Sequence, residues 1–153
     1  MSLSTHPAFG HARRHAVLSS LLLLAMLVLV WAALAPIGVK DRDHLIEIAP
    51  GTQQRRLAGD INAALPLTVR LTLGVRDVLT VKNNDSVPHY LGARPVKPGK
   101  QFRLPFESAS QQEFSSSAHF GGKLTVIVEP WPDPGTARLR WRTLELVQAI
   151  RHY

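Results

Sequence analysis

The stretch Glu113-Phe-Ser-Ser-Ser-Ala-His-Phe-Gly-Gly-Lys-Leu-Thr-Val-Ile-Val-Glu129 places one histidine, His119, in a loop that leads through a glycine pair into an apolar strand. Upstream, Asp85-Ser-Val-Pro-His-Tyr-Leu-Gly92 places a second histidine, His89, after another strand and a turn. Proline and glycine mark both segments as turns or loops. The sequence therefore predicts two histidine-bearing loops, each joined to a strand.

Further segments alternate apolar and polar residues, as half-buried strands do. Gly74 to Asp77 separates two of them, Leu67–Leu73 and Val78–Lys82, which we expect to form a hairpin. Thr52–Pro66 is polar and is expected to be a long connection. Short strands between turns, without helical periods, predict a mainly β domain of sandwich type over residues 44–130. The strands expected in it are His44–Ala49, Leu67–Leu73, Val78–Lys82, Gln101–Phe106 and Lys123–Glu129.

Together, the two histidine motifs resemble the copper-binding ends of a cupredoxin, the small β-sandwich that carries blue copper in electron-transfer proteins. The resemblance covers residues 44–129 and implies a Greek-key sandwich. It implies His89 and His119 as imidazole ligands and puts Ser116 at the family's cysteine position and Leu124 at its methionine position. In the family, two histidines, a cysteine and a distant axial methionine hold the copper.

The chain has no cysteine, so no thiolate ligand is available anywhere in it. A serine hydroxyl is a hard, weakly acidic ligand and a leucine offers no donor, so we expect no blue-copper centre. Two interpretations of His89 and His119 remain. They are loop residues satisfied by hydrogen bonds, or they form a weak, open site for copper or zinc. Ser115–Ser117 is expected to be a polar loop edge. A serine nucleophile paired with His119 lacks the Gly-x-Ser-x-Gly elbow, and we expect no enzyme.

Residues 16–38 carry no charge and are long enough for a membrane span, which needs about 20 apolar residues. Residues 1–15 form a flank with Arg13 and Arg14, and residues 39–43 form a short linker. Ala33-Leu-Ala35 would suit signal cleavage, but the run is long and Pro36 would follow the cut. We expect an uncleaved anchor in a bacterial inner membrane that is crossed once, with the C-terminal domain in the periplasm.

The tail, residues 131–153, begins with a proline-rich linker and continues as a basic amphipathic segment. Leu139, Leu146, Val147 and Ile150 share a helical face, so we expect a helix with Thr136 as a cap. This helix would dock on its own sandwich, or on a membrane surface or partner subunit.

The 153-residue chain is 45% apolar and has a formal net charge of +7. Its basic residues are scattered, so a nucleic-acid partner is not indicated. We expect a membrane-anchored accessory subunit that packs with protein partners in a larger assembly, such as a respiratory or photosynthetic electron-transfer complex. The alternative is a copper-binding or electron-transfer protein that uses His89 and His119 with a non-cysteine ligand set.

Overall fold

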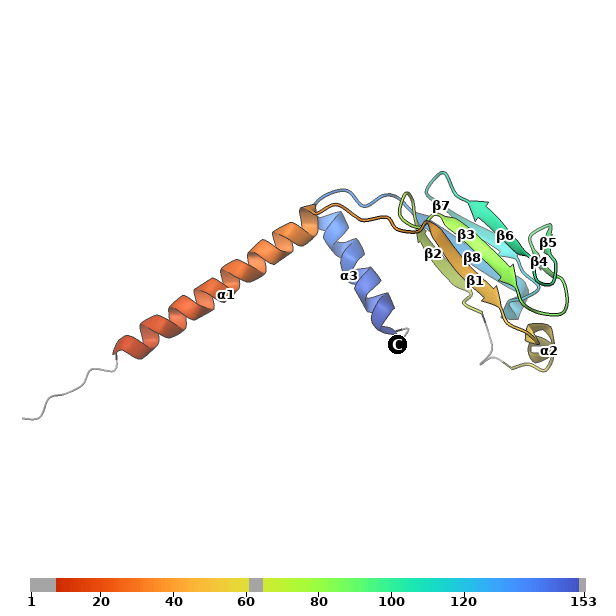
Figure 1. Ribbon diagram of the computed structural model, residues 1–153, viewed down its shortest axis with the longest axis horizontal. Helices are drawn as coiled ribbons and strands as arrows, with labels where there is room; N and C mark the ends of the chain where they lie inside the picture. Colours follow the sequence, from red (N-terminus) through yellow and green to blue (C-terminus); the bar gives the residue numbers. More distant parts are fainter. Residues whose placement is uncertain (1–7, 61–64, 152–153) are drawn as a thin grey trace, which may run out of the picture. The chain divides into compact units, whose positions relative to one another are not determined.

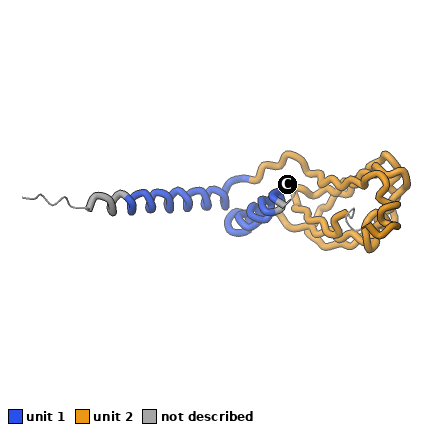
Figure 2. The backbone as a smooth tube through the Cα atoms, turned by 90° about the horizontal axis from the view of Figure 1, so that it is seen from below, with its two compact units in different colours: residues 1–36, 132–153 blue, residues 37–131 orange. Residues whose placement is uncertain are grey.

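The structure, a computed structural model, describes residues 8–60 and 65–151. The chain divides into two compact units, coloured separately in Figure 2. One comprises residues 37–131 and holds the strands. The other combines residues 1–36 with residues 132–153 and holds two helices. Residues 1–7 of the predicted flank and residues 152–153 of the predicted tail lie outside the described residues.

Residues 37–131 form a sandwich of two three-stranded sheets, with a two-stranded hairpin at one end (Figure 1). Strand order is β1-β3-β6 in one sheet and β2-β8-β7 in the other, and β4 pairs with β5. The mainly β sandwich predicted from the sequence is confirmed. The elements are β1 (Asp43–Ile48), α2 (Thr52–Leu57), β2 (Thr68–Thr72), β3 (Val78–Asn83), β4 (His89–Leu91), β5 (Arg94–Val96), β6 (Gln101–Pro105), β7 (Ser110–Ser115), the 3-10 turn η2 (Phe120–Gly122) and β8 (Lys123–Glu129).

Each three-stranded sheet combines one parallel and one antiparallel pair. In the first, β1 runs parallel to β3, with Leu45 opposite Thr80, and β6 is antiparallel to β3. In the second, β2 runs parallel to β8 and β7 is antiparallel to it, with Phe114 opposite Leu124. Parallel neighbours require long crossover connections, so the chain passes repeatedly from one sheet to the other.

The predicted hairpin between residues 67–73 and 78–82 is wrong, because β2 and β3 belong to different sheets. The turn between them leads the chain from one sheet to the other. Gly74 has a φ of +72°, and its N–H donates to the buried carboxylate of Asp77, which also pairs with Arg42. Alternation in each strand arises because one face of each sheet is buried, and it does not identify the strand's partner.

The core lies between the two sheets. Leu79 of β3 and Leu124 and Val126 of β8 are fully buried, and burial of such a side chain contributes about 1.5–3 kcal/mol. Strand β8 buries every second residue, which is the two-residue period of a sheet with one inner face. The buried apolar set is Ile46, Ile48, Val69, Leu71, Leu79, Val81, Leu91, Val96, Phe106, Ala118, Leu124, Val126 and Val128.

The structure adds elements that the sequence patterns did not indicate. The polar stretch predicted as a long connection contains the short helix α2. Strands β4 and β5 are only three residues long, too short to show an alternation. Strand β7, Ser-Gln-Gln-Glu-Phe-Ser, is largely polar because it lies at the edge of its sheet and is mostly exposed.

The second unit contains α1 (Ala8–Leu34) and α3 (Thr136–Arg151). Helix α1 begins inside the predicted flank and ends before Pro36. Its segment Arg14–Leu34 is long and apolar enough to cross a membrane, although a signal sequence would pass the same test. The expected C-terminal helix is present as α3. It begins at Thr136 itself, so Thr136 is its first residue rather than its cap.

Candidate functional site

Both predicted imidazoles are buried. His89 is the first residue of β4 and is 2% exposed, and His119 immediately precedes η2 and is 3% exposed. Ser116, the first residue after β7, is buried too. Leu124 lies in β8 with no exposed surface, as part of the hydrophobic core. The described structure therefore gives Leu124 a packing role.

The loop that carries His89 is fixed by Asn83, the last residue of β3. The Asn83 amide nitrogen donates to the carbonyl oxygens of Val87 and Val96, each at 2.8 Å. Its side-chain oxygen accepts from the N–H of Asp85 at 2.9 Å. Asn83 is fully buried, so these three bonds satisfy a side chain that would otherwise be costly to bury. They give the loop one conformation and set the direction in which Asp85 points.

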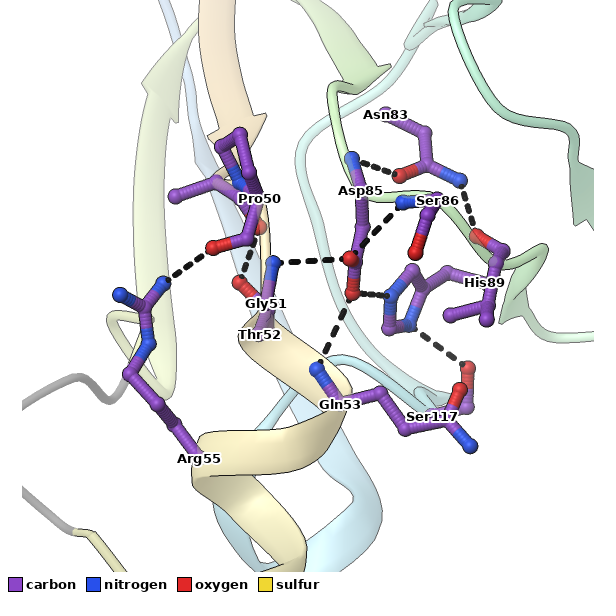
Figure 3. Close-up of polar contacts among 12 residues, drawn as sticks. Pro50, Gly51, Thr52, Gln53, Arg55, Asn83, Asp85, Ser86, His89 and Ser117 are labelled. Carbon is purple, nitrogen blue, oxygen red and sulfur yellow. Dashed lines mark hydrogen bonds and ion pairs between the residues drawn. The ribbon is translucent and has the colours of Figure 1, made fainter.

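Asp85 is the centre of the polar network in Figure 3. Its carboxylate accepts from the backbone N–H groups of Gly51 (2.8 Å), Gln53 (3.0 Å) and Ser86 (2.8 Å) and contacts His89 Nε2 at 2.9 Å. Burial alone would raise the pKa of Asp85, but the bonds from His89 and the three N–H groups lower it below its usual range. The carboxylate is therefore ionised, and Nε2 of His89 carries the proton that it donates to Asp85.

The other nitrogen of His89 faces Ser117. Nδ1 lies 3.3 Å from Ser117 Oγ, and Ser117 Oγ also accepts from the N–H of Tyr90 at 2.8 Å. Backbone bonds hold this contact in place, from Ser117 N–H to the Tyr90 carbonyl at 3.1 Å and from Gly92 N–H to the Ser115 carbonyl at 2.7 Å. Both ring nitrogens of His89 are thus engaged.

His119 has a different environment. Its Nδ1 lies 2.6 Å from Ser116 Oγ, but its Nε2 is buried without a hydrogen-bond partner among the described residues. Burial of the ring and, to a smaller extent, the nearby His89 lower the pKa of His119 to about 4. His119 is therefore neutral at neutral pH. Its loop closes through bonds from Ser116 N–H to the Gly122 carbonyl and from Gly122 N–H to the His119 carbonyl.

Asp85, His89 and Ser117 occur in the order acid, imidazole and hydroxyl that hydrolases use. A cavity of about 160 Å³ among the described residues of the sandwich is not lined by any of these three residues. It is apolar and is lined by residues of β4, β6 and β7 with the turn after β4. The Ser117 hydroxyl oxygen also accepts from the N–H of Tyr90, so the row is part of the hydrogen-bond network of these loops.

The donor set does not fit a blue-copper centre. Such a centre needs a thiolate. The resemblance assigns the cysteine position to Ser116, whose hydroxyl contacts Nδ1 of His119. Among the described residues, no three histidine, cysteine, aspartate or glutamate side chains are grouped to hold a metal ion. What the geometry does supply is two buried imidazoles, each with Nδ1 against a serine hydroxyl.

Two mixed sheets with a histidine after β3 and another before β8 reproduce the arrangement that the sequence resemblance implied. Cupredoxins are among the solved structures that are similar to this chain. No protein-family model matches the sequence, and no curated protein is similar to it.

The similar solved structures cover more than half of this chain. A purple cupredoxin from Nitrosopumilus maritimus is 24% identical, with a TM-score of 0.43, over 57% of this chain and 100% of that one. A Cu(I) form of an amicyanin variant is 17% identical, with a TM-score of 0.41, over 60% of this chain and 86% of that one. An oxidised amicyanin variant is 18% identical, with a TM-score of 0.40 and the same coverage. The Cu(I) belongs to that first amicyanin variant.

Sequence reasoning found both histidines and Ser116 but missed the roles of Asp85, Asn83 and Ser117. Asp85 lies four residues before His89 in a loop that begins at a strand end, and this spacing was the available signal. Ser117 was read only as a loop edge. Its role depends on β4 lying beside the segment after β7, a contact between residues 27 positions apart that no local pattern encodes.

Proposed function

We propose that this chain is a membrane-anchored, cupredoxin-like accessory subunit of a larger membrane assembly, without a blue-copper centre and without catalytic activity. The observation that carries the proposal is the contact between Ser116 Oγ and His119 Nδ1. A hydroxyl occupies the thiolate position and is hydrogen-bonded to the neighbouring imidazole. The site is therefore closed by its own side chains and contributes to stability.

A sandwich that does not hold a redox metal acts through its surface. We propose an electron-transfer complex, respiratory or photosynthetic, as the host assembly, because the resemblance to cupredoxins associates this fold with such systems. The anchor would be α1, retained in a bacterial inner membrane, with the sandwich on the periplasmic side. The uncharged run and the length of α1 support a membrane span.

Purification from native membranes in mild detergent tests the proposal. An affinity tag after Tyr153 should recover stoichiometric partner chains together with this one. Recovery of a lone monomer at every detergent concentration would contradict the proposal.

A second candidate, a copper site on His89 and His119, is favoured by one observation. Each imidazole presents Nδ1 to a hydroxyl rather than to a backbone group, so a metal could displace those contacts. Cu(II) bound there should be retained after dialysis and lost in both His89→Ala and His119→Ala. An unfolding temperature that does not change on adding Cu(II) would contradict a copper site on His89 and His119.

The position of Ser116 can be tested by restoring the missing donor. With Cu(II), Ser116→Cys combined with Leu124→Met should give an intense visible absorption, because a thiolate would lie beside His119. Ser117→Cys with the same second change is the matched control and should stay colourless. Equal spectra would show that the cysteine position has been misassigned.

A further inference from the structure

Two arginines of α3 bind the carbonyl groups at the C-terminal end of α1. Arg138 Nη1 donates to the carbonyl oxygens of Leu34 and Ala35, both at 3.1 Å, and its other nitrogens contact the Pro132 carbonyl at 3.3 Å. Arg142 Nη2 donates to the Ala35 carbonyl at 2.8 Å and the Pro36 carbonyl at 3.1 Å. These arginines satisfy carbonyls that a helix end leaves unpaired.

The buried guanidinium of Arg138 is 6% exposed and is surrounded by carbonyl oxygens. The C-terminal end of a helix carries a partial negative charge, so a cation there is favoured. The Arg142 guanidinium also lies over the ring of Trp31, 5.9 Å from its centroid. Both guanidinium groups therefore lie against the last turn of α1. The N–H of Gly135 also donates to the Ala33 carbonyl oxygen at 3.0 Å.

These contacts fix the depth at which α3 begins if α1 crosses a bilayer. A charged side chain in the hydrocarbon region is costly, and tryptophan favours the headgroup level. The cluster of Trp31, Arg138 and Arg142 therefore belongs at the interface where α1 leaves the membrane. Helix α3 starts at this point and turns away from the axis of α1 (Figure 1).

Helix α3 has an apolar stripe without a partner in the described structure. Leu146 is 62% exposed, Ile150 67% and Val147 46%, and at 100° per residue they share one side of the helix with Leu139. The helix carries four arginines against one glutamate. An exposed apolar stripe on a basic helix is the pattern of a helix that lies in a membrane interface.

We propose that α3 lies in the lipid headgroup region, with Leu146, Val147 and Ile150 directed toward the acyl chains. It is held at the exit of α1 by Arg138 and Arg142. This inference rests on the part of the proposed function that makes α1 a bilayer span, and it is independent of the sandwich and its partners. Lipid is the occupant because the stripe begins one turn from residues that the anchor places at the interface.

The lack of native cysteines allows single labels to be placed cleanly. We would attach an environment-sensitive fluorophore to Leu146→Cys, Ile150→Cys and Leu144→Cys in the purified full chain. Each would be reconstituted in phosphatidylcholine vesicles, with and without phosphatidylglycerol. Leu144 is also apolar and exposed but lies on another side of α3, which makes it the matched control. A label at Leu24→Cys reports on the span itself.

Labels at positions 146 and 150 should emit at shorter wavelength and be quenched severalfold less by aqueous iodide than the label at 144. Phosphatidylglycerol should increase this difference, because α3 is basic. Equal quenching at 144, 146 and 150, with position 24 protected, would overturn the proposal and leave the anchor intact. Quenching at position 24 as well would overturn the span together with the proposal.

Arg138→Gln provides a second readout that tests the contact with α1. Added to the Leu146→Cys variant, it should increase quenching at position 146. Arg140→Gln is the control and should have a smaller effect, because Arg140 forms no hydrogen bond with α1 among the described residues. Protection of 146 and 150 in native membranes but not in vesicles would show that a protein covers the stripe, and the proposal would be wrong.

Discussion

His89 and His119 are buried almost equally, at 2% and 3% exposure, yet their ring nitrogens have very different surroundings. His89 has a partner on each side, with Asp85 on Nε2 and Ser117 on Nδ1. His119 has Ser116 on Nδ1, and no described residue forms a hydrogen bond with its Nε2. Burial alone therefore does not define the role of a histidine. His89 is a structural link between the β3–β4 loop, the start of α2 and the last loop, whereas His119 is a neutral ring held by a single hydroxyl.

The largest expected loss of stability comes from removing the carboxylate of Asp85, which contacts Nε2 of His89. Asp85→Ala should lower the free energy of unfolding by about 3–5 kcal/mol, because it leaves buried N–H groups and one imidazole N–H without an acceptor. Urea unfolding of the full chain in detergent, followed by circular dichroism, measures this. Glu107→Ala removes an exposed carboxylate and is the control. Equal stability of the two variants would refute the central role of Asp85.

Replacing each imidazole by an apolar side chain tests the asymmetry directly. His89→Leu should cost about 2–3 kcal/mol, because the buried charge on Asp85 loses a donor. His119→Leu should cost about 1 kcal/mol or less, since it also removes an unpaired polar atom. The same unfolding measurement serves for both. A larger loss for His119→Leu than for His89→Leu would reverse the assignment of roles.

Lowering the pH should act mainly through His119. Its pKa is about 4 in the folded state and 6.5 without the fold, so the unfolded chain binds more protons between those values. The free energy of unfolding should therefore fall as the pH drops from about 6.5 to 4, by on the order of 2 kcal/mol. Asp85 has a lowered pKa, so its contribution persists through this window and is lost only at lower pH. His119→Leu should weaken the dependence and leave the smaller slope that comes from His44, whose pKa is also lowered by burial. A slope unchanged by the substitution would contradict this assignment.

The serine contacts give the smallest expected effects. Ser117→Ala and Ser116→Ala should each cost about 1 kcal/mol, the usual net value of one hydrogen bond. Nitrogen-15 chemical shifts of the imidazoles separate the two variants. Ser117→Ala should move Nδ1 of His89 alone, and Ser116→Ala should move Nδ1 of His119 alone. Changes in the chemical shifts of both imidazoles in either variant would mean that the surroundings of His89 and His119 are coupled.

Much of the fold could be predicted from the sequence because the informative features are local. The alternation in β8 and in residues 44–48 follows from one buried sheet face, and the uncharged run before Pro36 predicts α1. The partnering of β2 and β3 could not be predicted in this way. Both strands alternate, and the corner at Gly74 and Asp77 that sends them to different sheets resembles a hairpin turn.

The site was predicted in part for a similar reason. His89, His119 and Ser116 follow from the resemblance, which depends on spacing within two short motifs. The networks that decide what these residues do are long-range, since Asp85 binds backbone groups of Gly51 and Gln53 more than 30 positions away. Arg138 and the Ala35 carbonyl that it binds are 103 positions apart, so no local pattern predicts this contact either.

Metal analysis and electron paramagnetic resonance of the assembly purified from native membranes test the central claim most directly. We expect partner chains in fixed ratio, no stoichiometric copper bound to this chain and no cupric signal that changes in His89→Ala. One copper per chain, with a cupric signal abolished by His89→Ala and by His119→Ala, would contradict it and establish a copper site in its place.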